Sequence, residues 1–480
     1  MKHFKFQKGF DSQYNEIIED ELKLSGSIPE WLSGTLIRTA PSQFEVGKRT
    51  MNHWFDGLAM LHKFSFGNQK VAYANKFLKS RAFQEARDNK RVAFSEFGTD
   101  PCRDIFNKVT SFFKEPQGTD NGCVNINLHG NSFTATTETP LHNVFDLNTL
   151  DTQGHFSYDD KVEGQITTVH PHYDKRGTLF SYLTNFGIKS KYNVYFQESD
   201  SHTRKIIASI PVDAPAYMHS LGMTERFIIL TEFPLRANPL KFRFSNKTFA
   251  EKYTWRPEEG TRIHVINKND GAITTVETEP FFAFHHANAF EKNGEIVFDL
   301  IAHQNVDIIR NFYIKHLRSQ KPVDASGELW RFKINLAEKN VKRETLSSAL
   351  MELPRINYKK INTQDYQYVY GSGTTIKGNF WDNITKLDVK MAKELIWHEK
   401  DCYPGEPVFV ENPKAKAEDE GVLLSVVFNA KNQRSFLLIL DAKNLSEVAR
   451  AEVPQHIPFG FHGQYVNSDD PVETFITLHH

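Results

Sequence analysis

The sequence predicts an all-β protein folded as a seven-bladed β-propeller. Three observations lead to this prediction: helical periodicity is scarce, short β-branched and aromatic segments recur, and a weak repeat marks about seven units. No low-complexity segment or Pro/Ser linker divides the 480 residues, so residues 1–480 are expected to form a single domain.

The predicted strands are short runs that alternate apolar and polar residues, or are rich in β-branched and aromatic residues. Each run ends at Asn, Asp, Gly or Pro, the residues that favour turns. Clear examples are NSFTATTET (131–139), RFIILTEF (226–233), TRIHVINKND (261–270), EIVFDLIAH (295–303), VLLSVVFNA (422–430) and SFLLILDA (435–442).

The repeat is an apolar residue followed by Asp or Asn and then a turn. It occurs at Phe145-Asp146, Val212-Asp213, Ile266-Asn267, Ile334-Asn335, Leu387-Asp388 and Leu440-Asp441, with gaps of 67, 54, 68, 53 and 53 residues, and Phe66-Gly67-Asn68 is a possible first mark. A four-stranded propeller blade takes roughly 40 to 50 residues plus loops, so the spacing fits one mark per blade. The same turn residues follow strands in any β protein, and the repeat is degenerate.

Composition limits the classes of function. The net charge is −1, so no basic field indicates a nucleic-acid partner. The N-terminus MKHFKFQKGF lacks the apolar core of a signal peptide, and three cysteines suit a reducing compartment, so we expect a cytoplasmic protein. The 39 Phe residues, against 16 Tyr and 6 Trp, indicate a large apolar core or a tunnel for an apolar substrate.

Four histidines lie in aromatic or Pro/Gly-bearing contexts. They are His170 in TTVHPHYD, His219 in AYMHSLGMTE, His285 in FAFHHANAFE and His462 in PFGFHGQYV. Their spacings of 49, 66 and 177 residues exclude a zinc finger or an HExxH motif, whose ligands lie close together. Inner propeller strands face one axis, where four neutral imidazoles would hold a divalent ion that keeps its Lewis acidity. The alternative is that four of 20 histidines are ordinary core or surface residues.

Three glutamates are candidates to orient these imidazoles. Glu138, Glu352 and Glu406 lie among apolar residues or prolines, where an unpaired carboxylate is costly. A metal-bound imidazole usually donates its second N–H to a carboxylate, a carbonyl or a water. The alternative is that these glutamates lie at strand ends in solvent.

The chain resembles the carotenoid cleavage oxygenases, a non-haem iron family that includes the retinal pigment epithelium isomerohydrolase, and most resembles the animal β-carotene oxygenase branch. The resemblance runs nearly end to end, through GTLIRTAPSQFEVG (34–47), NHWFDGLAMLHKFSF (52–66), FGTDPCRDIF (97–106), TDNGCVNI (119–126), HPHYD (170–174), HSLGMTERFII (219–229), FHHANAFE (284–291), ELPRIN (352–357), EPVFV (406–410), EDEGVLLSVV (418–427) and AEVPQHIPFGFHG (451–463).

The resemblance implies a seven-bladed propeller with Fe(II) on its axis and a cap of helices and loops, at about residues 97–120 and 233–260, over the iron-bearing face. By motif, the iron ligands are His170, His219, His285 and His462, and His285 is preferred to His286. The carboxylates behind them are Glu138, Glu352 and Glu406, Thr137 lies near the iron, and no catalytic group beyond the metal centre is implied.

The implied reaction is cleavage of a carotenoid C=C bond with O2 to aldehyde products, with β-carotene to retinal as the first expectation. Alternatives are eccentric apocarotenoid cleavage, stilbene cleavage, a retinoid isomerohydrolase, or a non-enzymatic interaction propeller with structural histidines. Thr137 stands where stilbene cleavers favour Lys, which argues against a stilbene substrate. The double bond cleaved, the preferred end groups and the oligomeric state are not determined by the sequence.

A membrane-derived substrate implies contact with a membrane surface. Residues 105–113 (IFNKVTSFF) mix Ile, Val and three Phe with one Lys, which predicts a short amphipathic helix on the bilayer; the alternative is a buried connecting helix. Residues 233–244 are a second candidate, and Cys102 matches a position that some relatives lipidate. One departure from the family is the pair Thr39 and Ala40 in place of Asn and Gly, which we expect to affect loops or substrate entry more than the iron.

Overall fold

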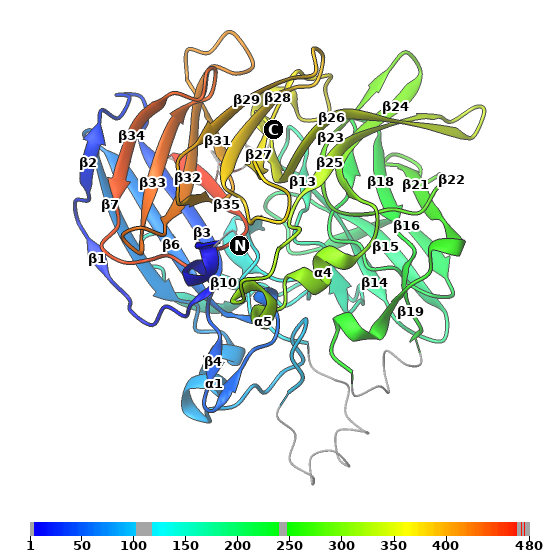
Figure 1. Ribbon diagram of the computed structural model, residues 1–480. Coiled ribbons are helices and arrows are strands. Elements are labelled where there is room, and N and C mark those ends of the chain that lie inside the picture. The colour runs from blue at the N-terminus through cyan, green and yellow to red at the C-terminus, as the bar shows by residue number, and fades with distance from the viewer. Residues whose placement is uncertain (1–3, 102–117, 240–246, 468–471, 473–474, 476–480) are drawn as a thin grey trace.

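The computed structural model describes residues 4–101, 118–239, 247–467, 472 and 475, and antiparallel sheets dominate this part of the chain. The sheets stand around a common axis as seven blades (Figure 1), which confirms the predicted seven-bladed propeller. All six segments predicted as strands contain a strand.

The first four blades follow the chain in order. Blade 1 holds β1 (Ile18–Glu19), β3 (Gly34–Gln43), β6 (Leu58–Gly67), β7 (Lys70–Phe77) and β35 (Gly463–Asn467). Blade 2 holds β8 (Asn125–His129), β9 (Ser132–Thr136), β10 (Asn143–Phe145) and β11 (Thr152–His155). Blade 3 holds β12 (Ile166–Thr167), β13 (His172–Tyr173), β14 (Leu179–Asn185), β15 (Ser190–Gln197) and β16 (Arg204–Val212). Blade 4 holds β17 (Gly222–Met223), β18 (Phe227–Glu232), β21 (Thr261–Asn267) and β22 (Ile273–Thr278).

Blades 5 and 6 share one continuous sheet. Blade 5 is formed by β23 (Phe282–Lys292), β24 (Glu295–His303), β25 (Gly327–Asn335) and the first part of β26 (Asn340–Arg355). The end of β26 pairs with β27 (Tyr368–Gly373), followed by β28 (Asn383–Asp388) and β29 (Lys393–His398). The 16 residues of β26 therefore leave blade 5 as its outer strand and enter blade 6 as its inner strand, which brings Glu352 to the axis.

Strands from both ends of the chain close the ring. Blade 7 holds β30 (Cys402–Pro404), β31 (Val408–Glu411), β32 (Gly421–Asn429), β33 (Arg434–Asp441) and β34 (Glu447–Glu452), with β2 (Lys23–Gly26) on its outer edge. The near-C-terminal strand β35 pairs with β3 inside blade 1, where Arg38 faces Gly463. The pairing of β2 with β34 and the pairing of β35 with β3 both tie the first blade to the last. The pairing of β35 with β3 also holds the segment that carries His462.

The repeat seen in the sequence marks hairpins between the third and fourth strands of the blades. The Asp or Asn side chain accepts hydrogen bonds from one or two backbone N–H groups just beyond it, which stabilises the turn. This holds at Asp146, Asn267, Asn335, Asp388 and Asp441. Asn68 and Gln69, both with positive φ, form the corresponding β6–β7 turn. Asp213 is the exception, because it follows β16, the outermost strand of blade 3.

Three of the described α-helices lie at one end of the propeller, toward the lower side of Figure 1. They are α1 (Arg81–Asp88), α4 (Asp307–Asn311) and α5 (Ile314–Leu317), and the two-stranded sheet of β19 (Leu235–Ala237) and β20 (Tyr253–Trp255) lies at the same end. Other short elements are η1 (Phe6–Phe10), β4 (Glu45–Val46), β5 (Arg49–Thr50), η2 (Trp54–Asp56), η3 (Ala250–Lys252), η4 (Pro257–Glu259) and α6 (Tyr358–Ile361). The single-domain boundaries and the limits of the cap remain predictions.

The predicted membrane segments lie largely beyond what the structure describes. Residues 105–113 and Cys102 are outside the described residues. Of the second candidate, residues 233–239 are described, and Phe233 and Leu235 in it are buried rather than exposed. Within the described part of the chain, no helix has the length and apolar character that crossing a bilayer requires.

Buried histidines away from the axis predict that acid destabilises the fold. Burial lowers the pKa of His53, His62 and His142 to about 3, from an ordinary value of 6.5. Between these values the unfolded chain binds more protons than the folded one, so stability falls as the pH drops below about 6.5. We expect the urea midpoint to be clearly lower at about pH 5 than at about pH 7.5. Equal midpoints at the two pH values would contradict this expectation.

Candidate metal centre

The four histidines singled out in the sequence meet at the propeller axis. Their ligand atoms all lie within 4.8 Å of one another, and three of the four side chains are buried. His170 Nε2 lies 3.2 Å from His219 Nε2, and His285 Nε2 lies 3.2 Å from His462 Nε2. Ring centroids 4.4 to 5.1 Å apart place the imidazoles around one point. Four nitrogens that converge without another protein partner form a cluster suited to one metal ion.

Each histidine lies in or just before the inner strand of a different blade. His170 and His219 precede β13 and β17, and a bridge between His170 and Ser220 joins their segments. His462 directly precedes β35, and its backbone N–H donates to Val124 O. His285 lies within β23, at a break in register between Ala283 and His286. A β-bulge of this kind re-aims a side chain, and here it accompanies the inward direction of His285.

Three of the four rings are held from behind by carboxylates. Glu138 Oε1 lies 2.7 Å from His219 Nδ1, Glu352 Oε2 lies 2.7 Å from His285 Nδ1, and Glu406 Oε1 lies 2.8 Å from His462 Nδ1. In each pair Nδ1 donates to the carboxylate, which leaves the Nε2 lone pair directed at the centre of the cluster. All three glutamates are buried, so the alternative that they lie in solvent is wrong.

Burial sets the protonation states of the cluster. It lowers the pKa of His462 to about 3 and the pKa values of His170 and His285 below the ordinary 6.5, and the neighbouring imidazoles add to the effect. Burial alone would raise the pKa of Glu352 and Glu406, but the groups paired with them outweigh it and lower both pKa values to about 2. Neutral imidazoles backed by ionised carboxylates are the forms that bind a divalent first-row metal.

Two neighbouring histidines are occupied elsewhere. His286 contacts Ser220 Oγ through Nδ1 at 2.8 Å and Thr231 Oγ1 through Nε2 at 3.0 Å. His172 contacts Tyr358 Oη at 2.6 Å and Leu221 O at 3.0 Å. Neither ring has a free nitrogen, so the preference for His285 over His286 agrees with the geometry.

Sequence reasoning missed the groups that hold the carboxylates. The Tyr217 hydroxyl donates to Glu138 Oε1 at 2.7 Å, and His303 Nε2 lies 2.9 Å from Glu352 Oε1. Arg355 Nε lies 3.0 Å from Glu406 Oε1. Tyr217 lies two residues before His219, and Arg355 lies three residues after Glu352. This proximity is the one signal in the sequence that pointed to them. His303 had no such signal.

The departure at Thr39 and Ala40 lies beside the segment that leads to His462, although it is far from the ligand motifs in the sequence. Strand β3 pairs with β35, and the Thr39 hydroxyl donates to Gly122 O at 2.7 Å. A Cβ on Gly460 would come within 2.7 Å of Ala40 Cβ, so Ala40 packs directly against the segment that leads to His462. Of the two residues, Ala40 is therefore the one in contact with the segment that carries His462.

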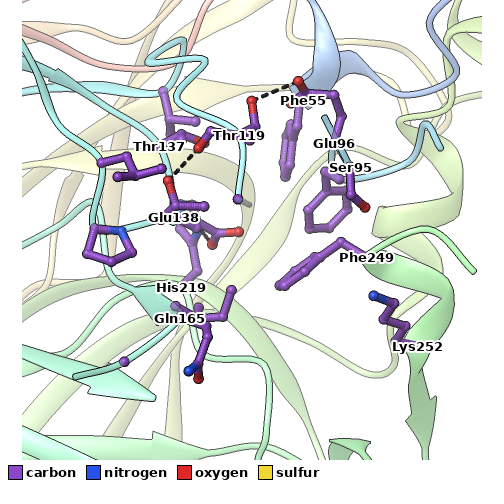
Figure 2. A pocket seen from close by; sticks show the side chains of 18 of the residues that line it. Phe55, Ser95, Glu96, Thr119, Thr137, Glu138, Gln165, His219, Phe249 and Lys252 are labelled. Carbon is purple, nitrogen blue, oxygen red and sulfur yellow. Dashed lines mark hydrogen bonds and ion pairs between the residues drawn. The ribbon is translucent and has the colours of Figure 1, made fainter. Parts of the chain in front are cut away.

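A mainly apolar cavity of about 320 Å³ adjoins the cluster at His219 (Figure 2). Phe55, Phe97 and Phe249 line it, and Thr137 and Glu138 form part of the wall beside the histidine. A second void of about 20 Å³ is lined by His219, His285 and His462 together with aromatic residues, and it shares Phe55 with the larger cavity. A void of this volume holds about one molecule of the size of water.

Comparison with known proteins gives one consistent result. The profile of the family described as "Retinal pigment epithelial membrane protein" matches residues 10–467. A "Carotenoid-cleaving dioxygenase, mitochondrial" of Mustela putorius furo is 34% identical over 509 aligned positions, which cover 92% of this chain and 93% of that protein. A "Beta,beta-carotene 15,15'-dioxygenase" of Homo sapiens is 34% identical over 510 positions, which cover 93% and 92%.

Solved structures of apocarotenoid oxygenases are similar to this chain over nearly its whole length. A variant of the Synechocystis apocarotenoid oxygenase superposes with a TM-score of 0.85 at 25% identity, and covers 97% of this chain and 98% of that one. The cobalt-substituted form of that oxygenase superposes with a TM-score of 0.84 at 26% identity, with the same coverage.

Proposed function

Because the chain belongs to the retinal pigment epithelial membrane protein family, we propose that it is an Fe(II)-dependent dioxygenase that cleaves a C=C bond of a carotenoid with O2. The observation that carries this proposal is the cluster of four converging imidazoles, one of which, His219, lines an apolar cavity. Relatives named as carotenoid dioxygenases match almost the full length of the chain, which supports the same chemistry.

The iron ligands in this proposal are His170, His219, His285 and His462. Four neutral nitrogens would hold the ion without cancelling its charge. When bound, Fe(II) supplies the activation of O2. The contribution of the protein is to hold the rings: Glu138, Glu352 and Glu406 each keep the Nδ1 proton of one imidazole and thereby fix its direction.

The substrate in this proposal is a polyene bound in the cavity beside His219. One alkene and one O2 give two carbonyl products, so no proton donor or nucleophile from the protein is needed. Phe55 and Phe249 exclude water and position the chain by shape, because a polyene offers little to hydrogen-bond. Thr137 adds only a small side chain to the wall beside Glu138, and we assign it a role in shaping the cavity.

Two further assignments complete the proposal. The chain forms one propeller domain with the cap at about residues 97–120 and 233–260. It is cytoplasmic and takes up its substrate at a membrane surface through residues 105–113, whose composition of Ile, Val and three Phe with one Lys supports contact with lipid.

Product analysis tests the function directly. Purified, iron-loaded protein is incubated with β-carotene under air, and the products are separated by chromatography. We expect aldehyde products, with retinal if the central bond is cleaved, and about one iron per chain. An apocarotenal in place of retinal would assign eccentric cleavage, and absence of any oxygen-dependent product from β-carotene or other carotenoids would reject the proposal.

A further inference from the structure

Besides Glu138, a second carboxyl group lies in the wall of the apolar cavity. Glu96 is 3% exposed and lines the cavity together with Phe97 and Phe249. Figure 2 shows it across the cavity from Glu138 and His219. Cleavage of the polyene makes no use of Glu96, since the metal centre has its own three carboxylates. A buried carboxyl group in an apolar wall is costly unless it has a polar partner, so this residue calls for a physical reason.

The surroundings of Glu96 favour its neutral form. Among the described residues no Lys or Arg pairs with it, and its hydrogen-bond donor is the Thr119 hydroxyl, 2.7 Å from Oε1. Burial is the main cause that raises the pKa of Glu96 well above its ordinary 4.5, and the carboxylates of Asp56 and Asp120 raise it further. This shift favours the neutral carboxylic acid over the carboxylate, and Oε1 already accepts a hydrogen bond from the Thr119 hydroxyl. The other oxygen has no hydrogen-bond partner among the described residues, and in the neutral acid it is the one that carries the O–H.

We propose that Glu96 and Thr119 form a subsite for an oxygen atom at one end of the polyene. The cavity would then prefer carotenoids or apocarotenoids that carry a hydroxyl or carbonyl group at that end over those with hydrocarbon ends. A carbonyl oxygen accepts the O–H of Glu96, and a hydroxyl can both accept and donate. This inference rests on the proposed function and narrows its substrate class.

The expected preference is about tenfold. One hydrogen bond from a neutral donor in a site without water contributes about 1.4 kcal/mol to binding. This free energy corresponds to about a tenfold ratio in kcat/KM. A hydrocarbon end would leave the Glu96 O–H without a partner in the cavity, which further weakens binding of substrates with hydrocarbon ends. Because the subsite binds the end of the molecule rather than the reacting bond, the difference should appear mainly in KM.

The test compares three substrates: β-carotene, its 3,3'-dihydroxy derivative and a β-apocarotenal. Iron-loaded wild type is expected to show a kcat/KM about tenfold higher for at least one oxygenated substrate. In Glu96→Leu, which removes the polar group at similar volume, the ratio should fall to about one, while cleavage of β-carotene is retained. In Glu96→Gln, the isosteric control, the side-chain N–H₂ can still donate, so most of the preference should remain.

Three results would overturn the inference. They are a wild-type ratio near one, a ratio that favours β-carotene, and a Glu96→Leu variant with an unchanged ratio. The wild-type ratio decides the question even if Glu96→Leu does not fold. Failure of the proposed function looks different, because the wild type would then cleave none of the three substrates.

Discussion

Replacing His285 by alanine is expected to abolish both iron binding and carotenoid cleavage. The substitution removes one of four nitrogens from the cluster and leaves the ionised, buried Glu352 without one of its two imidazole partners. Loss of the metal removes several kcal/mol of transition-state stabilisation. Since each 1.4 kcal/mol is about tenfold in rate, we expect activity to fall by at least about 10³-fold. Metal analysis and product formation from the same preparation measure the two effects.

The matched control is the adjacent histidine. His286 contacts Ser220 and Thr231 rather than the cluster, so His286→Gln should keep about the wild-type iron content and most of the activity. Equal iron content in His285→Ala and wild type would contradict the assignment of His285. Loss of iron in His286→Gln with retention in His285→Ala would show that the ligand is the second histidine of the pair.

The second large effect is expected at Glu352. Its two oxygens hold His285 at 2.7 Å and His303 at 2.9 Å, and the backbone N–H of Leu353 donates to it as well. Glu352→Gln keeps the shape but removes the negative charge and one acceptor. Loss of such a partner costs about 10- to 100-fold in metal affinity or activity. We expect iron affinity, measured by competition with a chelator, to fall by that factor.

A control glutamate lies on the same sheet. Glu328 accepts a hydrogen bond from Trp330 Nε1, and within the described part of the chain it forms no hydrogen bond or ion pair with the four histidines. Glu328→Gln should therefore bind iron as wild type does. If Glu352→Gln also bound iron with wild-type affinity, the carboxylate would have no part in holding the ligand, and its burial would need another explanation.

The sequence predicted those features whose physical cause is local. A turn that follows a strand needs a side chain that accepts backbone N–H groups, so Asp146, Asp388 and Asp441 mark hairpins wherever they stand. Asp213 looks the same in the sequence but follows an outermost strand, because an apolar–Asp pair does not encode its place within a blade. The motifs likewise pointed to the four histidines that converge.

Features that depend on pairs of distant residues were not predictable. His303 and Glu352 are 49 positions apart, and they meet because the end of β24 and the end of β26 that carry them lie close together in the fold. The continuous β26 could not be recognised, since its change of blade is a matter of pairing rather than of composition. Glu96 is an ordinary acidic residue in its sequence context. It is buried because residues distant in the sequence, among them Thr119 and Phe249, lie beside it in the wall of the cavity.

The central claim is that one iron lies among the Nε2 atoms of His170, His219, His285 and His462. Anomalous diffraction at the iron absorption edge, from crystals of active protein, tests it most directly. We predict one strong peak enclosed by these four nitrogens. Active protein with no peak there, or with its iron bound at other residues, would contradict the account.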